Sequence, residues 1–221
     1  MTGTDTGVGK TWFATALIAT LRAQGRRVAG MKPVASGCDS TPTGLRNADA
    51  LALLSASGLD LPYEAVNPYA FVPPIAPHLA AAEADVAIRF SVIERAFGVL
   101  AARSDCVVVE AVGGWQVPLG EDGAVADLAR CLGLPVLLVV GLRLGCLNHA
   151  VLSARDICRT GASLAGWVGC AVDPQFERRD DNLQALQQLL PGPCWGLLPY
   201  APRAEPIDLV RHLRVPVQDI D

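Results

Sequence analysis

The glycine-rich run at residues 3–11 constrains this chain more than any other segment. It reads Gly-Thr-Asp-Thr-Gly-Val-Gly-Lys-Thr and leads into a helical pattern over residues 10–24. Glycines let backbone N–H groups converge on anionic oxygens. Lys10 supplies a cation for phosphates, and the Thr11 hydroxyl suits Mg²⁺. A helix that starts at Lys10 also points the positive end of its dipole at the same phosphates.

These features predict a phosphate-binding loop in a variant form. Five residues separate Gly3 from the Gly-Lys-Thr sequence, where the usual spacing is about four. The alternative interpretation is a glycine-rich turn that caps an ordinary helix.

Length, charge and cysteine content exclude several classes of protein. A chain of 221 residues suits a single domain, residues 1–221, with one substantial core. The net charge of −4 gives no basic surface for nucleic acid. The longest apolar stretch, residues 134–142, is too short to span a membrane, and no signal peptide is evident. Seven cysteines without a Cys-x-x-Cys spacing indicate a reducing, cytoplasmic location.

Short apolar segments alternate with helical patterns along the chain. Strands are expected at residues 27–31, 105–110, 136–141, 164–171 and 194–197. Helices are expected at residues 10–24, 46–55, 91–103, 124–131, 146–160 and 180–190, with a long proline-rich loop at 62–77. This alternation predicts an α/β fold of the phosphate-loop nucleotidase type, with a mostly parallel sheet and helices on both faces. Ligands of such sheets bind beyond the carboxyl ends of the strands.

One strand of this fold is expected to be missing. A phosphate-binding loop normally follows a strand, but only Met1 and Thr2 precede Gly3. We therefore expect the native protein to begin further upstream and this chain to have reduced stability. A native protein whose intact mass fits Met1 as its first residue would contradict that expectation.

Polar residues stand where the first strands end. Lys32 follows strand 27–31 and is placed to stabilise charge that develops during phosphoryl transfer. The alternative for Lys32 is a solvated side chain. Ser36, four residues later, is placed to hydrogen-bond a small substrate.

Two carboxylates are candidates for a metal site. Asp49 lies in the first turn of helix 46–55, either as a Mg²⁺ ligand or as an acid that favours a helix N-terminus. Glu110 ends an apolar strand, as the second metal-site acid of phosphate-loop enzymes does. Gly113 and Gly114 follow it and allow a tight loop beside a nucleotide. The alternative for Glu110 is an ordinary charged residue that terminates a buried strand.

The segment at residues 144–149 opens the helix after strand 136–141. Its sequence is Leu-Gly-Cys-Leu-Asn-His, and a helix N-terminus of this kind can receive a carboxylate. Asn148 is either part of that site or a cap residue. Cys146 is expected to be a plain buried thiol.

Together these segments resemble the dethiobiotin synthetase family. The matching runs follow the family's order over nearly the whole chain: residues 3–11, 32–37, 44–49, 67–69, 77–78, 110–115, 139–149, 165–168 and 196–200. The loop alone is unspecific. The Lys-Pro-Val-Ala-Ser-Gly run at 32–37 and the run at 144–149 are much more specific.

The resemblance implies an ATP- and Mg²⁺-dependent reaction. The family joins CO₂ to 7,8-diaminopelargonic acid and closes a cyclic urea in biotin biosynthesis. The diamine first forms a carbamate, ATP phosphorylates it, and the second amine attacks the mixed anhydride.

The resemblance also implies roles for single residues. Thr11, Asp49 and Glu110 would hold Mg²⁺, and Lys10 and Lys32 would be the catalytic lysines at phosphate and carbamate oxygens. Ser36 would contact the diamine. The partner subunit of a homodimer would help hold its carboxylate tail, with Asn148 at the matching position. The implied ATP-binding set is Gly7, Val8, Gly9, Lys10, Thr11, Trp12, Asp49, Glu110, Gly113, Pro199, Tyr200 and Ala201.

Some positions depart from the family's pattern. Where many members have an asparagine that reads adenine, this chain has Gly169 and Cys170. A thiol is a weak hydrogen-bond partner, so the sequence does not predict selectivity for adenine. Ala111 and Val112 stand where the family favours Gly-Ala, and Glu205 is a weaker candidate for a nucleotide contact.

Two other functions stay open at this point. One is another amidoligase or ATPase with the same fold, although the chain lacks the further domains or the second loop lysine that these need. The other is a non-catalytic nucleotide-binding paralogue, which the missing strand and Cys170 would suit.

Overall fold

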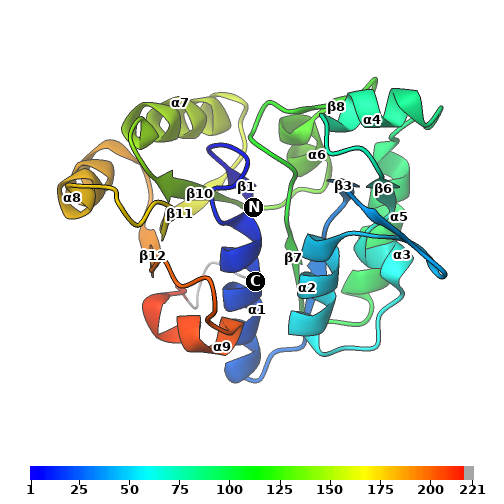
Figure 1. Ribbon diagram of the computed structural model, residues 1–221, viewed down its shortest axis with the longest axis horizontal. Coiled ribbons are helices and arrows are strands. Elements are labelled where there is room, and N and C mark those ends of the chain that lie inside the picture. The colour runs from blue at the N-terminus through cyan, green and yellow to red at the C-terminus, as the bar shows by residue number, and fades with distance from the viewer. Residues whose placement is uncertain (217–221) are drawn as a thin grey trace.

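Parallel strand pairing organises the computed structural model, which describes residues 1–216 (Figure 1). The largest sheet has the order β1-β10-β11-β12, and all its pairs are parallel. Its strands are β1 (Thr2–Gly3), β10 (Val136–Leu142), β11 (Leu164–Ala171) and β12 (Cys194–Leu198). The expected strands at 136–141, 164–171 and 194–197 are thus confirmed, and the carboxyl ends of β10 and β11 lie at one edge.

Smaller pairs of strands make up the other half of the molecule. β2 (Val28–Met31) pairs in parallel with β7 (Cys106–Val109), as expected from their apolar sequences. β3 (Val34–Ser36) pairs in parallel with β6 (Tyr69–Phe71). Two short antiparallel pairs complete the set: β4 (Asp39–Thr41) with β5 (Gly44–Arg46), and β8 (Pro118–Gly120) with β9 (Gly123–Ala124).

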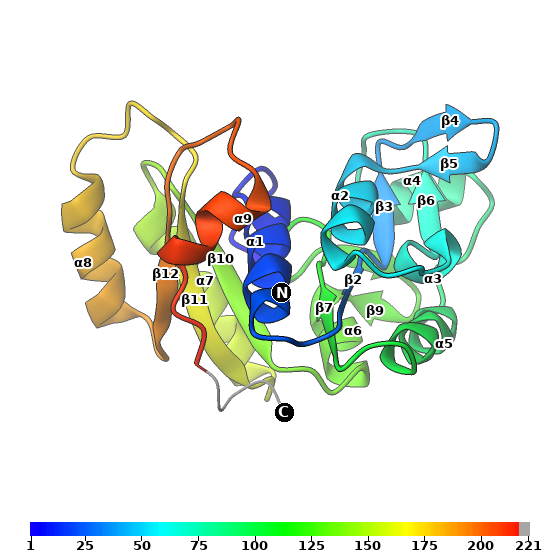
Figure 2. The same cartoon turned by 90° about the horizontal axis from the view of Figure 1, so that it is seen from below.

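Helices cover both faces of the main sheet, as Figure 2 shows. Alternate residues of β10 belong to different cores, because side chains alternate across a strand. Leu137 and Val139 pack with α1 (Lys10–Ala23), whereas Leu138 and Val140 pack on the side of α7 (Cys146–Arg159). The mostly parallel α/β fold with helices on both faces is therefore confirmed.

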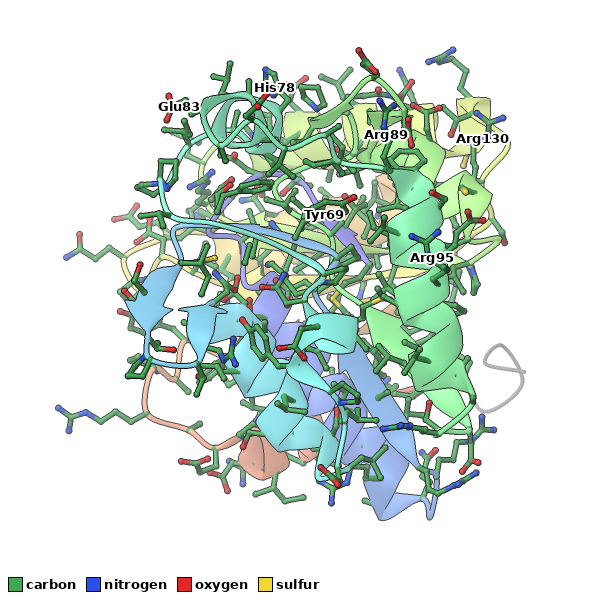
Figure 3. All side chains as sticks on the ribbon, turned by 90° about the vertical axis from the view of Figure 1, so that its right-hand side faces the viewer. Tyr69, His78, Glu83, Arg89, Arg95 and Arg130 are labelled. Atoms are coloured by element: carbon green, nitrogen blue, oxygen red, sulfur yellow. The ribbon has the colours of Figure 1, made fainter. Side chains whose placement is uncertain are left out.

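The remaining helices agree with the sequence at most positions. They are α2 (Ala48–Ser57), α5 (Phe90–Ala101), α6 (Val125–Cys131) and α8 (Arg179–Leu189), each within about two residues of its expected bounds. Figure 3 shows the side of the molecule on which α5 runs from Arg89 past Arg95, with His78 and Glu83 on α4 (Pro77–Glu83). A short α9 (Pro206–Leu209) and a 3₁₀ turn at Val210–His212 close the described chain.

The long proline-rich loop expected at residues 62–77 is wrong in part. It contains α3 (Tyr63–Val66) and strand β6. The prolines concealed both elements because they stand at tolerated positions: Pro62 is the N-cap residue of α3, and Pro68 directly precedes β6. Asn67 then fastens the segment, because its Nδ2 donates to Lys32 O at 2.7 Å and to Tyr69 O at 3.0 Å.

The strand before the phosphate loop is represented by two residues. Thr2 and Gly3 form β1 beside Leu138 and Val139 of β10. On the other side, Met1 N donates to Val109 O at 2.5 Å and Ala111 N donates to Met1 O at 3.0 Å. The expectation that no strand precedes the loop is therefore wrong in part, because the two-residue β1 stands there and joins the two halves at the carboxyl end of the sheet.

Among residues 1–216, the structure contains no helix with both the length and the apolar character that crossing a membrane requires.

Gly30 of β2 tests how tightly the two halves are packed. An added Cβ at Gly30 would lie 2.7 Å from Leu53 Cβ and 3.0 Å from Ile18 Cδ1. We expect Gly30→Ala to lower the free energy of unfolding by about 1–3 kcal/mol through overpacking. Urea denaturation measures this change. Gly98→Ala is the control: Gly98 lies in α5, and a Cβ added there would meet nothing within 4 Å, so alanine should stabilise by about 0.5–1 kcal/mol. Equal effects at both positions would contradict the prediction.

Candidate nucleotide and substrate site

Two left-handed glycines shape the phosphate-binding loop. Gly7 has φ of 71° and Gly9, the N-cap residue of α1, has φ of 91°. Few residues other than glycine adopt these angles at low cost. Lys10 is the first residue of α1, and its Nζ donates to Asp5 O at 2.8 Å across the loop. The ammonium therefore already lies over the concave side of the loop.

The ammonium of Lys32 lies buried between two carboxylates. Lys32 follows β2, and its Nζ is 2.6 Å from Glu110 Oε1 and 2.8 Å from Asp49 Oδ2. Thr11 Oγ1 donates to the same Glu110 oxygen at 2.8 Å. The side chain of Lys32 is 5% exposed and that of Glu110 is 1% exposed, whereas Asp49 is 41% exposed. Four elements of the fold meet in this cluster.

Charge and burial set the protonation of the cluster. Burial alone would lower the pKa of Lys32, but the carboxylates of Glu110 and Asp49 outweigh it and raise the pKa above its ordinary value. Burial would raise the pKa of Asp49, but Lys32 holds it below its usual range. Burial, with the positive charge of Lys32, lowers the pKa of Lys10 to about 8. Lys10, Lys32 and Asp49 therefore all carry their charges near neutral pH.

One cavity of about 740 Å³ connects the loop to this cluster. Its lining residues come from distant parts of the sequence: Thr6, Gly7, Gly9, Lys10, Thr11, Trp12, Lys32, Ser36, Asn47, Asp49, Pro74, Ile75, Ala76, Pro77, Glu110, Val112, Gly113 and Val117. The cavity is large enough for a small-molecule ligand. The structure thus brings together the predicted loop, both lysines, both carboxylates and Ser36.

Two buried oxygen atoms at the cavity lack partners within the described part of the chain. They are Ser36 Oγ and Glu110 Oε2. A buried polar atom without a hydrogen bond is costly and points to a missing ligand or ion. The Ser36 hydroxyl and the second oxygen of Glu110 therefore each have capacity left for a hydrogen bond or an ion.

The donor set fits Mg²⁺. Thr11, Asp49 and Glu110 offer a hydroxyl and two carboxylates, and Mg²⁺ binds few protein oxygens while keeping water and phosphate oxygens. Residues 1–216 hold no cluster of three or more His, Cys, Asp or Glu side chains arranged for a metal.

Several predicted site residues lie outside this cavity. Val8 is buried below the loop, where a Cβ added at Gly141 would meet its side chain. Pro199 and Tyr200 line a separate pocket of about 590 Å³ with Ala171. Asn148 is exposed on α7. Ala201, the third residue expected at adenine, follows Tyr200 in the loop after β12 and lines neither pocket.

Cys170 lies directly under the phosphate loop. It is buried, with Sγ 3.9 Å from Gly9 O, and burial raises the pKa of its thiol to about 12. Glu205 lines a third hollow of about 820 Å³, beside Trp12 and between α1, α2 and α9. Cys170 does not line this hollow.

Sequence analysis did not single out Asn47 and Arg143 as site residues. Asn47 caps α2, where its Oδ1 accepts from the N–H groups of Asp49 and Ala50 at 3.1 and 3.2 Å. This cap fixes where α2 begins and therefore where Asp49 lies in its first turn. Arg143 follows β10 and pairs with the carboxylate of Asp5 in the loop. The role of Asn47 was predictable, because an asparagine directly before a helix is a common N-cap residue. The pairing of Arg143 with Asp5 was not, because it depends on how the chain folds.

Comparison with known proteins agrees with this geometry. A family model described as an AAA domain matches residues 1–207. A Xanthomonas oryzae pv. oryzae protein named ATP-dependent dethiobiotin synthetase BioD is 51% identical over 216 residues, covering 98% of this chain and 96% of that relative. A Pseudomonas paraeruginosa protein of the same name is 52% identical over 214 residues, covering 96% and 94%. The chain belongs to the ATP-dependent dethiobiotin synthetase family. Membership in this ligase family confirms the resemblance, and the paralogue and ATPase alternatives are not favoured.

The buried ion pair of Lys32 provides a stability test. Lys32→Met leaves Glu110 charged and unpaired, so we expect the free energy of unfolding to fall by about 3–5 kcal/mol. The double variant Lys32→Met/Glu110→Gln removes the uncompensated charge and should be more stable than Lys32→Met alone. Urea denaturation of the two single variants and the double variant completes the cycle. Strictly additive losses would contradict a direct interaction.

Proposed function

We propose that this chain catalyses the ATP-dependent carboxylation and ring closure of 7,8-diaminopelargonic acid with CO₂ to give dethiobiotin. The observation that carries the proposal is the single cavity that joins the phosphate loop, Lys32 and the unpartnered Ser36 hydroxyl. Family membership at about half identity over nearly the full chain supports the same assignment.

The residues suit a reaction that depends on charge and position more than on covalent catalysis. One amine of the diamine adds to CO₂ and loses a proton to give a carbamate. A carbamate oxygen attacks the γ-phosphorus, and ADP leaves. The second amine then attacks the anhydride carbon and expels inorganic phosphate, which closes the urea ring. Lys32 and Lys10 face the oxygens on which negative charge accumulates in the second step.

Each polar group has a proposed role in that sequence. Lys10 and the backbone of Gly7 and Gly9 bind the triphosphate at the start of α1. Thr11, Asp49 and Glu110 would hold Mg²⁺, which neutralises charge on the β- and γ-phosphate oxygens. Lys32 would then orient the carbamate, and Ser36 would hydrogen-bond the diamine. Val8, Trp12 and Gly113 would complete the nucleotide site, with Pro199, Tyr200 and Ala201 beside the base.

Substrate-dependent turnover tests the assignment. We expect purified protein with Mg²⁺ and ATP to release ADP only when 7,8-diaminopelargonate and bicarbonate are both present, with dethiobiotin formed in equal amount by mass spectrometry. Lys32→Gln should lower kcat by at least ~100-fold, because it removes the charge at the reacting oxygens. ADP release without either substrate would favour an ATPase, and nucleotide binding without turnover would favour a non-catalytic protein.

Ser36 provides a specific test of substrate binding. Loss of one hydrogen bond is worth about 0.5–1.5 kcal/mol, so Ser36→Ala should raise KM for the diamine by up to ~10-fold and leave KM for ATP unchanged. Steady-state kinetics with each substrate varied in turn measures both constants. Ser40→Ala, on the exposed hairpin of β4 and β5, is the control. An unchanged KM for the diamine would remove Ser36 from the substrate site.

We also propose that the chain is a single domain that forms a homodimer through α7. Asn148 and Leu152 are four residues apart in α7 and both are exposed, Leu152 to 57%. This spacing places them on one face of the helix, where Asn148 would approach the partner's substrate. Leu144, two residues before α7, is 91% exposed. Both hydrophobic cores contain residues of β10, which supports a single domain. The predicted domain is residues 1–221, of which residues 217–221 lie outside the described part of the chain.

The dimer has its own test. Leu152→Asp places a charge on the proposed interface and should shift the protein from dimer to monomer in sedimentation velocity. Leu189→Asp is the matched control, because Leu189 is similarly exposed, to 53%, but lies in α8 and not in α7. A dimer that survives Leu152→Asp would exclude this surface.

A cytoplasmic location is the last part of the proposal. All seven cysteines lie in the described chain and all are free thiols, as expected in a reducing compartment.

A further inference from the structure

The phosphate-binding loop carries a carboxylate of its own. Asp5 lies between Gly3 and the Gly-Lys-Thr sequence, and the residues that follow it, Thr6 and Gly7, line the cavity. An anionic side chain in a loop that binds anions works against the binding of a triphosphate, because like charges repel each other. A carboxylate at this position therefore requires a compensating positive charge.

Asp5 makes three contacts that shape the loop. Its Oδ1 accepts from Thr6 N at 2.7 Å, and its Oδ2 accepts from a guanidinium nitrogen of Arg143. Its backbone O accepts from Lys10 Nζ at 2.8 Å. The conformation of this one residue therefore sets both the direction of the loop backbone at Thr6 and the place of the Lys10 ammonium.

Arg143 is held next to the loop by the main sheet. It directly follows β10, which lies beside β1 (Figure 1), with Gly3 paired to Val139. Thr4 N extends this pairing by donating to Val139 O at 2.9 Å. The backbone O of Arg143 accepts from Cys146 N at 3.0 Å, in the turn that begins α7. The strand and the turn together fix the point from which the guanidinium reaches Asp5.

The pair of Asp5 and Arg143 contributes little to the stability of the fold. Their side chains are 50% and 39% exposed, and ion pairs with this exposure are screened by water. The ligand expected at the loop, however, carries several negative charges of its own. A guanidinium also holds a carboxylate in a defined geometry through its planar set of donors. The effect of the pair should therefore appear in nucleotide binding and not in folding.

We propose that Arg143 is a positioning residue of the phosphate-binding loop, which neutralises the Asp5 carboxylate and holds Asp5 in the conformation whose carbonyl carries Lys10. With Arg143 in place, the loop presents its N–H groups and the Lys10 ammonium to a triphosphate without an opposing anion. Without Arg143, the carboxylate repels the phosphates and the Lys10 ammonium loses its fixed acceptor. The inference rests on the proposed function only for the identity of the ligand, ATP.

Calorimetric titration with MgATP tests the role of Arg143 directly. Arg143→Met should raise the Kd for MgATP by ~10-fold, because the charge of Asp5 is then uncompensated. Arg143→Lys keeps the charge and should raise Kd by no more than ~3-fold. Arg27→Met is the matched control: Arg27 pairs with Asp105 at exposed positions, and neither residue lines the cavity, so Kd should stay within ~2-fold. An unchanged Kd in Arg143→Met would exclude the proposed role.

A double variant separates charge compensation from a general structural effect. In Asp5→Asn/Arg143→Met, the asparagine keeps an oxygen that can accept from Thr6 N but carries no charge. We expect its Kd for MgATP to return to within ~3-fold of the unchanged chain. Equal weakening in Arg143→Met and in the double variant would show that the charge of Asp5 is not the cause. Tm should change by less than ~2 °C in Arg143→Met and in Arg27→Met alike.

Steady-state kinetics distinguishes binding from catalysis. Arg143→Met should raise KM for ATP by ~10-fold and leave kcat within ~3-fold, because the loop holds the triphosphate equally before and during phosphoryl transfer. KM for the diamine should not change. A fall in kcat with an unchanged KM for ATP would contradict the proposal. MgATP binding is measured without the diamine, so Arg143 can fail this test while dethiobiotin is formed, and the proposed activity can fail while the binding result stands.

Discussion

The buried ammonium of Lys32 is the interaction on which the rest of the site depends. It contacts Asp49 at the start of α2 and Glu110 after β7, and Glu110 in turn accepts from Thr11 in α1. Without this cation, the buried carboxylate of Glu110 and the partly exposed carboxylate of Asp49 would repel each other. One positive charge therefore fixes the distance between three elements that are far apart in sequence. Thr11, Lys32, Asp49 and Glu110 all line the cavity, so the contacts among them help to set its shape.

The position of the phosphate loop follows from strand geometry. β1 contributes two residues, yet these enter between the ends of β7 and β10 and deliver Gly3 to the carboxyl edge of the sheet. From that edge the loop can reach Lys32 and Glu110, which end neighbouring strands. Asp5, held by Arg143 after β10, ties the far side of the loop to the same edge. The anion-binding surface is thus assembled from strand ends, where parallel sheets place ligands.

The sequence predicted the parts of this protein that repeat a strong pattern. Strands β10 and β11 and helix α1 are continuous apolar or amphipathic segments, and their bounds were predictable for that reason. Lys32, Asp49 and Glu110 were found because polar residues at strand ends and helix starts stand out against apolar neighbours. The three-residue strands β3 and β6 gave no periodic signal, because they are too short and lie among prolines. Other features depend on register that no sequence pattern carries. Cys170, for example, is one small residue within the apolar strand β11. Its place beneath Gly9 follows from how β11 pairs with β10, which the sequence does not show.

Ser36 Oγ and Glu110 Oε2 lose their water when the chain folds and gain no protein partner in exchange. Part of the dehydration that ligand binding requires is therefore completed during folding, and the folded state is less stable for it. At these two atoms, a change that raised the stability of the fold would weaken ligand binding, so selection for stability and selection for binding oppose each other. An apolar replacement at Ser36 would make a more stable protein that holds its ligand less well, whereas Glu110 is also required for its buried ion pair with Lys32.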